Sequence, residues 1–142
     1  MIHVHFAESD EEIRQCFSAM NELRPHLSPD GFFEQTKRMH RDLGYKLVYL
    51  EEDGALKSVA GFRIAESLAW GRHMYVDDLV SISSERGKGF GEKLFDWLLE
   101  HAKAQQCGQL HLDSGVQRFD THRFYINKGM AIMSHHFSLR LS

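Results

Sequence analysis

The chain has 142 residues, of which 42% are hydrophobic and 26% charged, a composition that suits one folded domain with a real core rather than a disordered chain. The formal net charge is −3 and the basic residues form no long run, so binding to nucleic acid, which requires a basic surface, is not expected. No apolar run approaches the roughly 20 residues of a membrane span, and no membrane partner is expected either.

The cysteine content is typical of a reducing compartment. Cys16 lies in an amphipathic helical pattern and Cys107 just before a strand pattern, without the Cys-x-x-Cys spacing of many metal and redox sites. We therefore predict that both thiols are reduced and structural, as in a cytoplasmic protein.

The chain opens with a predicted strand followed by two predicted helices. Residues 2–6 alternate between apolar and polar side chains, which is typical of a strand. The apolar residues between Ile13 and Met20 then recur at the spacing of one helical face. A second helix is predicted over residues 32–43, ending at Gly44, after a segment that holds both prolines of the chain.

The rest of the chain alternates between strand and helix patterns. Asp53-Gly54 lies between two apolar-rich runs and predicts a hairpin, because this dipeptide fits the tight turns that join antiparallel strands. The further elements are predicted in this order: a strand over residues 73–83, a helix with its apolar face at 94–102, a short strand at 109–114, a helix over 117–129 and a closing strand or pair of strands over 130–141. This order, without repeats or linkers, predicts one α/β (α+β) domain with a mixed sheet.

The segment Ser83–Phe95, SSERGKGFGEKLF, places three glycines between a strand and an amphipathic helix. Glycine lets the backbone approach a ligand closely, and the first N–H groups of a helix have no partner within it. The loop therefore predicts a bound phosphate-like anion. Two nucleotide-binding patterns do not fit, because the P-loop would need a hydroxyl residue at Gly89 and the dinucleotide fingerprint a glycine at Glu92.

What remains is Arg-x-x-Gly-x-Gly, and residues 77–98, DDLVSISSERGKGFGEKLFDWL, resemble the acyl-CoA-binding segment of the GNAT superfamily of acetyl-CoA-dependent N-acyltransferases. Residues 122–130, HRFYINKGM, resemble the late helix of that superfamily, in which a tyrosine stands four residues before a glycine. The resemblance implies a single N-acetyltransferase domain over residues 1–142. Its fold would be a central mixed, mostly antiparallel sheet flanked by helices, with splayed strands around the acyl-CoA site.

The resemblance also implies which residues bind acetyl-CoA, the co-substrate. Loop amides would hold the pyrophosphate, and the preceding strand would pair with the amides of the pantetheine arm. The loop residues are Arg86, Gly87, Lys88, Gly89, Phe90 and Gly91, and the strand residues are Leu79, Val80 and Ser81. In the superfamily this strand carries a bulge. A regular strand would put the Asp78 carboxylate on the apolar face of Val80 and Ile82, so we expect a bulge near Asp78–Val80 that removes this conflict.

Acyl transfer to an amine requires a neutral amine and a proton for the departing thiolate. Tyr125 is similar to the general acid of the superfamily, although its apolar neighbours also fit a tyrosine of the core. Asp77 and Asp78 lie where related enzymes often carry an acidic base or an amine-binding residue, and either could take the proton of the acceptor. Two adjacent carboxylates also suggest an acceptor that is cationic before reaction.

Ten histidines raise the question of a metal site. None stands in a His-x-x-x-His or Cys/His spacing, so no metal is expected. His111, His122, His135 or His136 could instead line the acceptor pocket and act as a base near neutral pH.

We therefore predict an N-acetyltransferase that moves an acetyl group from acetyl-CoA to a primary amine by direct attack. The acceptor would be a small molecule, an amino acid or a peptide or protein amine, selected by residues 21–33, the strands around Asp77 and the C-terminal strands. Two alternatives stay open: an acyl-CoA-binding sensor or interaction module with the same fold and little turnover, and a binder of another phosphate ligand. The superfamily also allows a homodimer formed by exchange of C-terminal strands.

Overall fold

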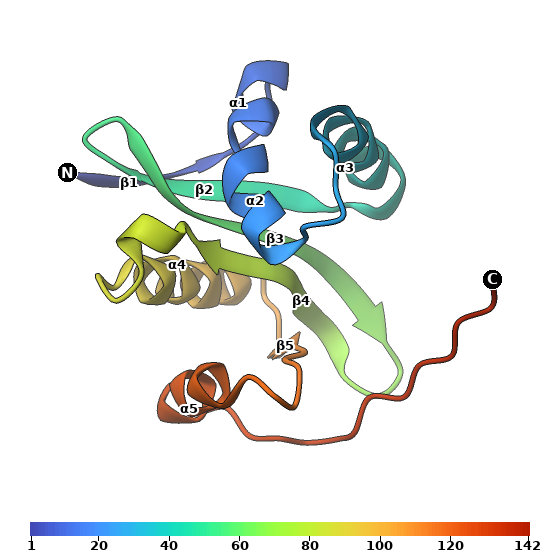
Figure 1. Ribbon diagram of the computed structural model, residues 1–142. Helices are drawn as coiled ribbons and strands as arrows, with labels where there is room; N and C mark the ends of the chain where they lie inside the picture. Colours follow the sequence, from blue (N-terminus) through green and yellow to red (C-terminus); the bar gives the residue numbers. More distant parts are fainter. The chain divides into compact units, whose positions relative to one another are not determined.

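The computed structural model describes residues 1–142 and divides into two compact units, Met1–His111 and Leu112–Ser142. Figure 1 shows the helices and strands in the colours of the sequence. Their bounds are β1 Ile2–Phe6, α1 Asp10–Gln15, α2 Phe17–Leu23, α3 Pro29–Leu43, β2 Lys46–Glu52, β3 Ala55–Ser67, β4 Gly71–Ser81, α4 Phe90–Ala104, β5 Gln109–Leu112 and α5 Phe119–Asn127.

The strands form one five-stranded sheet in the order β1-β2-β3-β4-β5. The strands β1 to β4 pair antiparallel, each beside its neighbour in the chain. Asp53 and Gly54 join β2 to β3 with positive φ at both positions, 52° and 83°, as the predicted tight hairpin requires. The predicted fold class, a mixed and mostly antiparallel sheet flanked by helices, is confirmed.

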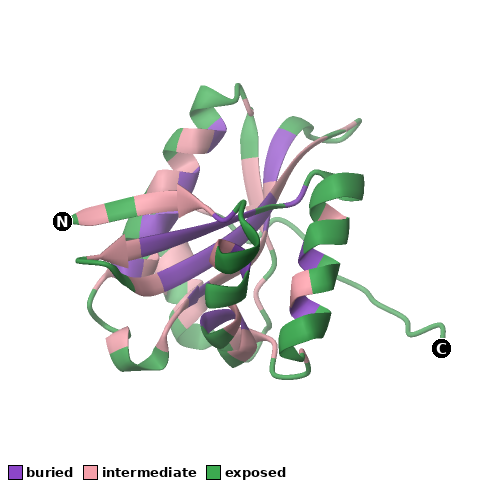
Figure 2. Cartoon of the chain, turned by 90° about the horizontal axis from the view of Figure 1, so that it is seen from above, coloured by how far each residue is buried: buried purple, intermediate pink, exposed green.

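Two helical layers bury the two faces of the strands β1 to β4. The layer of α1 to α3 shares a cluster of buried side chains with the sheet that includes Ile13, Met20 and Val59. On the other face α4 buries Phe95 and Leu98 and contacts β2, β3 and β4. Figure 2 shows this burial along the strands and on one side of the helices. The sheet is thus the common core of the first unit.

The first predicted helix is divided in two at Cys16. The Cys16 amide donates to the Ile13 carbonyl at 3.1 Å, an i→i−3 bond that tightens the turn between α1 and α2. Ile13, Cys16 and Met20 are all buried, so the predicted apolar face is confirmed. The helix α3 begins at Pro29 rather than at residue 32, because Ser28 caps it and proline fits a first helical turn.

The predicted closing strand or pair of strands over residues 130–141 is wrong. The structure has neither helix nor strand after α5, and Phe137, Leu139 and Leu141 are exposed. Alternating apolar residues make a strand only where a neighbouring strand pairs with their backbone, and no strand lies within residues 113–142.

Gly61 lets the side chain of Tyr45 lie against the middle of β3. A Cβ added at Gly61 would overlap the phenol ring and hydroxyl of Tyr45. Tyr45 itself is 3% exposed, so the ring has little room to move away. The strand therefore requires glycine at this position.

We expect Gly61→Ala to lower the free energy of unfolding by about 1–3 kcal/mol, as overpacking of a core does. Urea unfolding would measure the loss. Gly108→Ala is the matched control, because a Cβ there would meet its nearest atom, the Arg72 carbonyl oxygen, at an ordinary 3.9 Å. An equal loss in both variants would contradict the role of Gly61.

Candidate active site

The glycine loop connects β4 to α4 and leaves the first turn of α4 uncapped. The chain makes a 3₁₀ turn at Ser83–Glu85, and Gly87 and Gly89 then take positive φ of 83° and 86°. Gly89 precedes Phe90, the first residue of α4, and no side chain caps the helix there. A Cβ added at either glycine would meet nothing within 4 Å. This open space beside a helix start suits an anion, which the free amides and the helix dipole favour.

Ion pairs hold the loop to β3 and to α2. Lys57 on β3 lies 2.8 Å from the Glu85 carboxylate, and Lys88 lies 3.0 Å from it. Hydrogen bonds from these two ammonium groups, Lys57 first, lower the pKa of Glu85. Glu22 on α2 lies 3.5 Å from the Arg86 guanidinium. Both predicted cations of the loop, Arg86 and Lys88, are thus paired with carboxylates of the protein.

On one side, β4 extends beyond β5, its shorter neighbour in the sheet. Along its other edge β4 pairs with β3 from Gly71 to Ser81. The strand β5 has 4 residues against 11 in β4, and the Gly108 amide donates to the Arg72 carbonyl at 2.9 Å, which places β5 beside the start of β4. The backbone of residues 79–81 therefore lies beyond β5, directly before the glycine loop. An extended ligand can pair with backbone groups in such a place.

A bulge in β4 brings Asp77 and Asp78 to one side of the sheet. Phe62 pairs with Val76 and Gly61 with Asp78, so Asp77 is the extra residue. Neighbouring residues of a regular strand point to opposite faces, whereas both carboxylates here line one cavity.

The bulge lies beside its predicted position, but the predicted reason for it is wrong. We expected it to remove the Asp78 carboxylate from an apolar face. Asp78 and Val80 pair with alternate residues of β3, so both stay on the same face of the sheet. The conflict is resolved by hydrogen bonds instead, because Arg24 and Tyr45 both donate to the Asp78 carboxylate.

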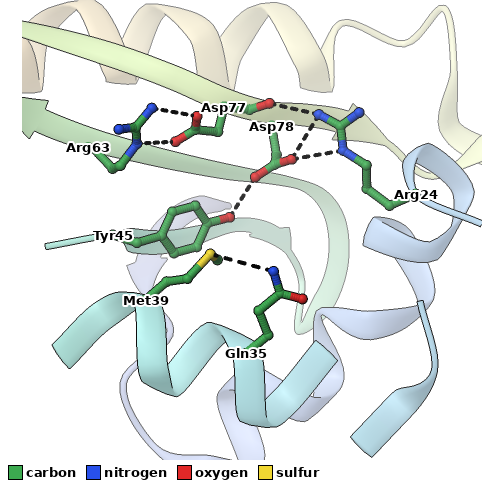
Figure 3. Close-up of polar contacts among 7 residues, drawn as sticks. All are labelled: Arg24, Gln35, Met39, Tyr45, Arg63, Asp77 and Asp78. Carbon is green, nitrogen blue, oxygen red and sulfur yellow. Dashed lines mark hydrogen bonds and ion pairs between the residues drawn. The ribbon is translucent and has the colours of Figure 1, made fainter. Parts of the chain in front are cut away.

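Each of the two carboxylates is paired with an arginine (Figure 3). Arg63 on β3 donates two hydrogen bonds to Asp77, at 2.7 and 2.9 Å. Arg24, which follows α2, donates from Nε to Asp78 at 3.1 Å and from Nη2 to the Asp77 carbonyl at 2.9 Å. Tyr45 donates to the other oxygen of Asp78 at 2.7 Å. The carboxylates are therefore held in fixed positions with their charge balanced.

A cavity of about 510 Å³ is lined by these groups together with side chains of α2 and α3. Its lining residues are Met20, Arg24, His26, Leu27, Phe32, Gln35, Thr36, Met39, Leu43, Tyr45, Arg63, Asp77 and Asp78. The segment 21–33 and the strand around Asp77, which the sequence predicts to select an acceptor, thus meet in one cavity.

Comparisons with known proteins identify the family. The model of the acetyltransferase (GNAT) family matches residues 10–130. The chain belongs to the GNAT acetyltransferase family. In agreement, it is 33% identical over 138 residues to the uncharacterized N-acetyltransferase YhdJ of Bacillus subtilis (strain 168), and the match covers 96% of this chain and 97% of YhdJ.

Solved GNAT structures share the fold. A GNAT family acetyltransferase of Staphylococcus aureus superposes with a TM-score of 0.82 at 18% identity, over 99% of this chain and 98% of that chain. AAC(6')-Iy, solved with the bisubstrate analog CoA-S-monomethyl-acetylneamine, superposes with a TM-score of 0.83 at 11% identity, over 100% and 99% of the two chains. At these identities the likeness shows the fold alone.

Tyr125, the predicted general acid of this GNAT protein, lies on α5 in the second unit. Burial raises the pKa of its phenol, against a smaller lowering by Arg118, so the phenol is protonated at neutral pH. In the same unit His122 bonds to a backbone carbonyl at 2.7 Å, and His136 lies 3.5 Å from Asp113. The roles of Tyr125 and of these histidines stay predictions, as does that of His135.

His111 is not among the residues that line this cavity, and its place in an acceptor pocket stays a prediction. Its ring stacks on Trp70 with 3.6 Å between the ring centroids, and it lies close to His73. The histidine that lines the cavity is His26, which the sequence did not single out.

The GNAT fold here shows no cluster of three or more His, Cys, Asp or Glu side chains that could hold a metal ion. Both cysteines are free thiols. Burial raises the pKa of Cys16 to about 12, so this thiol is protonated and unsuited to act as a nucleophile. No helix has both the length and the apolar character needed to cross a membrane.

Sequence reasoning missed Arg24, Tyr45 and Arg63. Arg24 and Tyr45 bond to a residue 54 and 33 positions away, and no local pattern marks such pairs. The one available signal was Gly61, because glycine inside a strand often marks the close approach of another group.

We expect Tyr45→Phe to lower the free energy of unfolding by about 1–3 kcal/mol, since a half-buried carboxylate oxygen loses its donor. Burial, followed by the Asp78 charge, raises the pKa of Tyr45 well above its usual value, so the wild-type phenol stays a donor at neutral pH. Tyr49→Phe is the control. Tyr49 makes a similar bond, at 3.0 Å to Glu12, but the other oxygen of that carboxylate accepts from the Glu8 and Ser9 amides at an exposed position, where water can replace a lost donor.

Urea unfolding of the two variants would test this difference. A loss in Tyr45→Phe no larger than in Tyr49→Phe would show that Asp78 does not depend on the phenol. An unchanged dependence of the unfolding free energy on urea concentration would show that the unfolding transition itself is the same.

Proposed function

We propose that this GNAT protein is an N-acetyltransferase that moves an acetyl group from acetyl-CoA to a primary amine by direct attack. The observation that carries the proposal is the uncapped first turn of α4 behind Gly87 and Gly89, directly after the bulged strand β4. Support comes from AAC(6')-Iy, which has the same fold and was solved with a CoA-derived analog, and from YhdJ, which is named an uncharacterized N-acetyltransferase.

Acetyl-CoA would bind along β4 and the glycine loop. The amides of residues 86–91 would hold its pyrophosphate, and the backbone of residues 79–81 would pair with its pantetheine amides. Arg86 and Lys88 already pair with carboxylates of the protein, so the backbone amides would carry most of the anion binding. The open space beside Gly87 and Gly89 leaves room for the phosphates.

The reaction balances without an added reagent. The lone pair of the neutral amine attacks the thioester carbonyl carbon, a C–N bond forms and the C–S bond breaks. The acceptor nitrogen gives up two protons, one when its ammonium form becomes the neutral amine and one when the amide forms. The departing thiolate takes up one proton. An N-acetyl amine and free coenzyme A result.

Three side chains would handle these protons. Asp77 or Asp78 would receive the proton of the acceptor, directly or through water, and Tyr125 would protonate the thiolate. Asp78 is the more favourable of the two carboxylates, because both oxygens of Asp77 accept from the charged Arg63 guanidinium, whereas one oxygen of Asp78 accepts from the neutral Tyr45 phenol.

We also propose that residues 1–142 act as one N-acetyltransferase domain, since the family match at 10–130 runs across both compact units. The acceptor would be a small-molecule or peptide amine. The free thiols agree with a cytoplasmic protein, which would bind neither nucleic acid nor membrane. A homodimer through the C-terminal segment is a further proposal.

One observation favours the alternative of an acyl-CoA-binding sensor with little turnover. Both carboxylates proposed for proton transfer are held by arginines, and a base whose oxygens are occupied accepts a further proton less readily. Such a module would bind the donor without consuming it.

The two functions are separated by one experiment. The purified protein is mixed with acetyl-CoA and a panel of amines, and released coenzyme A thiol is measured. Binding is followed in parallel as a rise of Tm with coenzyme A, ATP or NAD. Stabilisation by coenzyme A with transfer to an amine is expected. Stabilisation without transfer would indicate the sensor, and stabilisation by ATP or NAD instead would indicate another phosphate ligand.

Gly89→Ala is expected to raise the KM for acetyl-CoA on the order of tenfold, equivalent to about 1.4 kcal/mol of binding. The side chain would strain a φ of 86° and narrow the approach to the loop amides. Gly44→Ala is the matched control, because Gly44 has a φ of 70° and open space around it but ends α3, away from the loop. Equal KM values in the two variants would remove the loop from donor binding.

Tyr125→Phe is expected to lower kcat about 100-fold or more, as loss of a general acid does, with little change in the KM for acetyl-CoA. Steady-state thiol release would measure both constants. The control is Tyr49→Phe, which removes a phenol that lies outside the cavity. An unchanged kcat in Tyr125→Phe would take this residue out of the mechanism.

A further inference from the structure

The charges that line the cavity cancel. Arg24 and Arg63 face Asp77 and Asp78 in two ion pairs, with N–O distances of 3.1 and 2.7 Å. The cavity therefore has no excess of negative charge, although the sequence suggested a cationic acceptor from its two carboxylates. A polycation such as a polyamine would find little electrostatic complementarity there.

Arg24 keeps a hydrogen-bond donor for a ligand. Its Nε and Nη2 bond to Asp78 and to the Asp77 carbonyl, whereas Nη1 donates to no group of the protein (Figure 3). The side chain lines the cavity and is 43% exposed, so a ligand can reach it. A guanidinium fixed in this way favours a carboxylate, through a charge-assisted hydrogen bond.

The rest of the cavity wall is largely apolar. Met20, Leu27, Phe32 and Met39 line it from α2, α3 and the segment between them. Gln35 adds an amide whose one hydrogen bond is to the Met39 sulfur, at 3.9 Å (Figure 3). A ligand that fills this space would have an apolar body as well as a carboxylate.

We propose that the acceptor is an apolar amino acid, whose carboxylate binds Arg24, whose side chain packs on the apolar wall and whose α-amino group lies toward Asp78. This inference rests on the proposed acetyl transfer. The acetyl group leaves the sulfur of acetyl-CoA for the α-nitrogen, the C–S bond breaks as the C–N bond forms, and the thiolate receives a proton while the amine loses one.

The test compares L-phenylalanine with phenylalaninamide, phenethylamine and spermidine as acceptors, by thiol release from acetyl-CoA. We expect kcat/KM for phenylalanine to exceed that for each of the others at least tenfold, which is about 1.4 kcal/mol. Phenylalaninamide makes the comparison strict, because its less basic amine is neutral more often and would react faster if the carboxylate had no role.

Arg24→Gln is expected to bring the ratio of phenylalanine to phenethylamine kcat/KM close to one, and Arg24→Lys to restore part of it. Arg14→Gln is the matched control. Arg14 pairs with Asp30 at 3.2 Å on the surface and does not line the cavity, so the ratio should stay at the wild-type value.

A wild-type preference for phenethylamine or spermidine would overturn the inference while leaving the acetyltransferase function intact, and so would an unchanged ratio in Arg24→Gln. If no amine is acetylated, the proposed function fails, and the inference is then tested by whether phenylalanine binds. Phenylalanine that raises the Tm of the wild type with coenzyme A, but not that of Arg24→Gln, would support it. No rise in the wild type would overturn it.

Discussion

A single extra residue in β4 sets the geometry on which the proposed acceptor side of this protein depends. Because Asp77 is an extra residue that pairs in register with no residue of β3, two successive carboxylates line the same cavity instead of pointing to opposite faces. Two negative charges side by side must be balanced, which Arg24 and Arg63 do, and Tyr45 adds a neutral hydrogen-bond donor to Asp78. Gly61 leaves the space in which the phenol reaches Asp78.

The same strand joins the two halves of the proposed site. Its middle carries the carboxylates of the cavity, and its end leads through a 3₁₀ turn into the glycine loop and α4. The loop is anchored by carboxylates of α2 and of the turn itself, so its cations are largely neutralised. In the middle of β4 and at its end the protein therefore offers oriented hydrogen-bond donors, which select ligands by geometry as well as by charge.

Much of the fold could be predicted from local patterns. The hairpin at Asp53-Gly54, the start of α4 after Gly89 and the buried face of Ile13 and Met20 follow from backbone preference and periodicity, and the structure has all of them. The pattern failed at residues 130–141, because alternation does not supply a partner strand. It also failed to show the break at Cys16, where one tighter hydrogen bond divides a continuous apolar face.

The sequence by itself was enough to predict the proposed donor side of this GNAT protein. The glycine loop between a strand and a helix lies within 13 consecutive residues, and positive φ and helix-start amides are local properties. Only the tertiary structure decided the character of the proposed acceptor cavity. Asp78 pairs with the charge of Arg24, 54 positions away, and accepts a hydrogen bond from Tyr45, 33 positions away, and only folding brings these groups together. Their packing turned an acidic pair, seen in the sequence, into a cavity of balanced charge in which the Nη1 groups of Arg24 and Arg63 donate to no group of the protein.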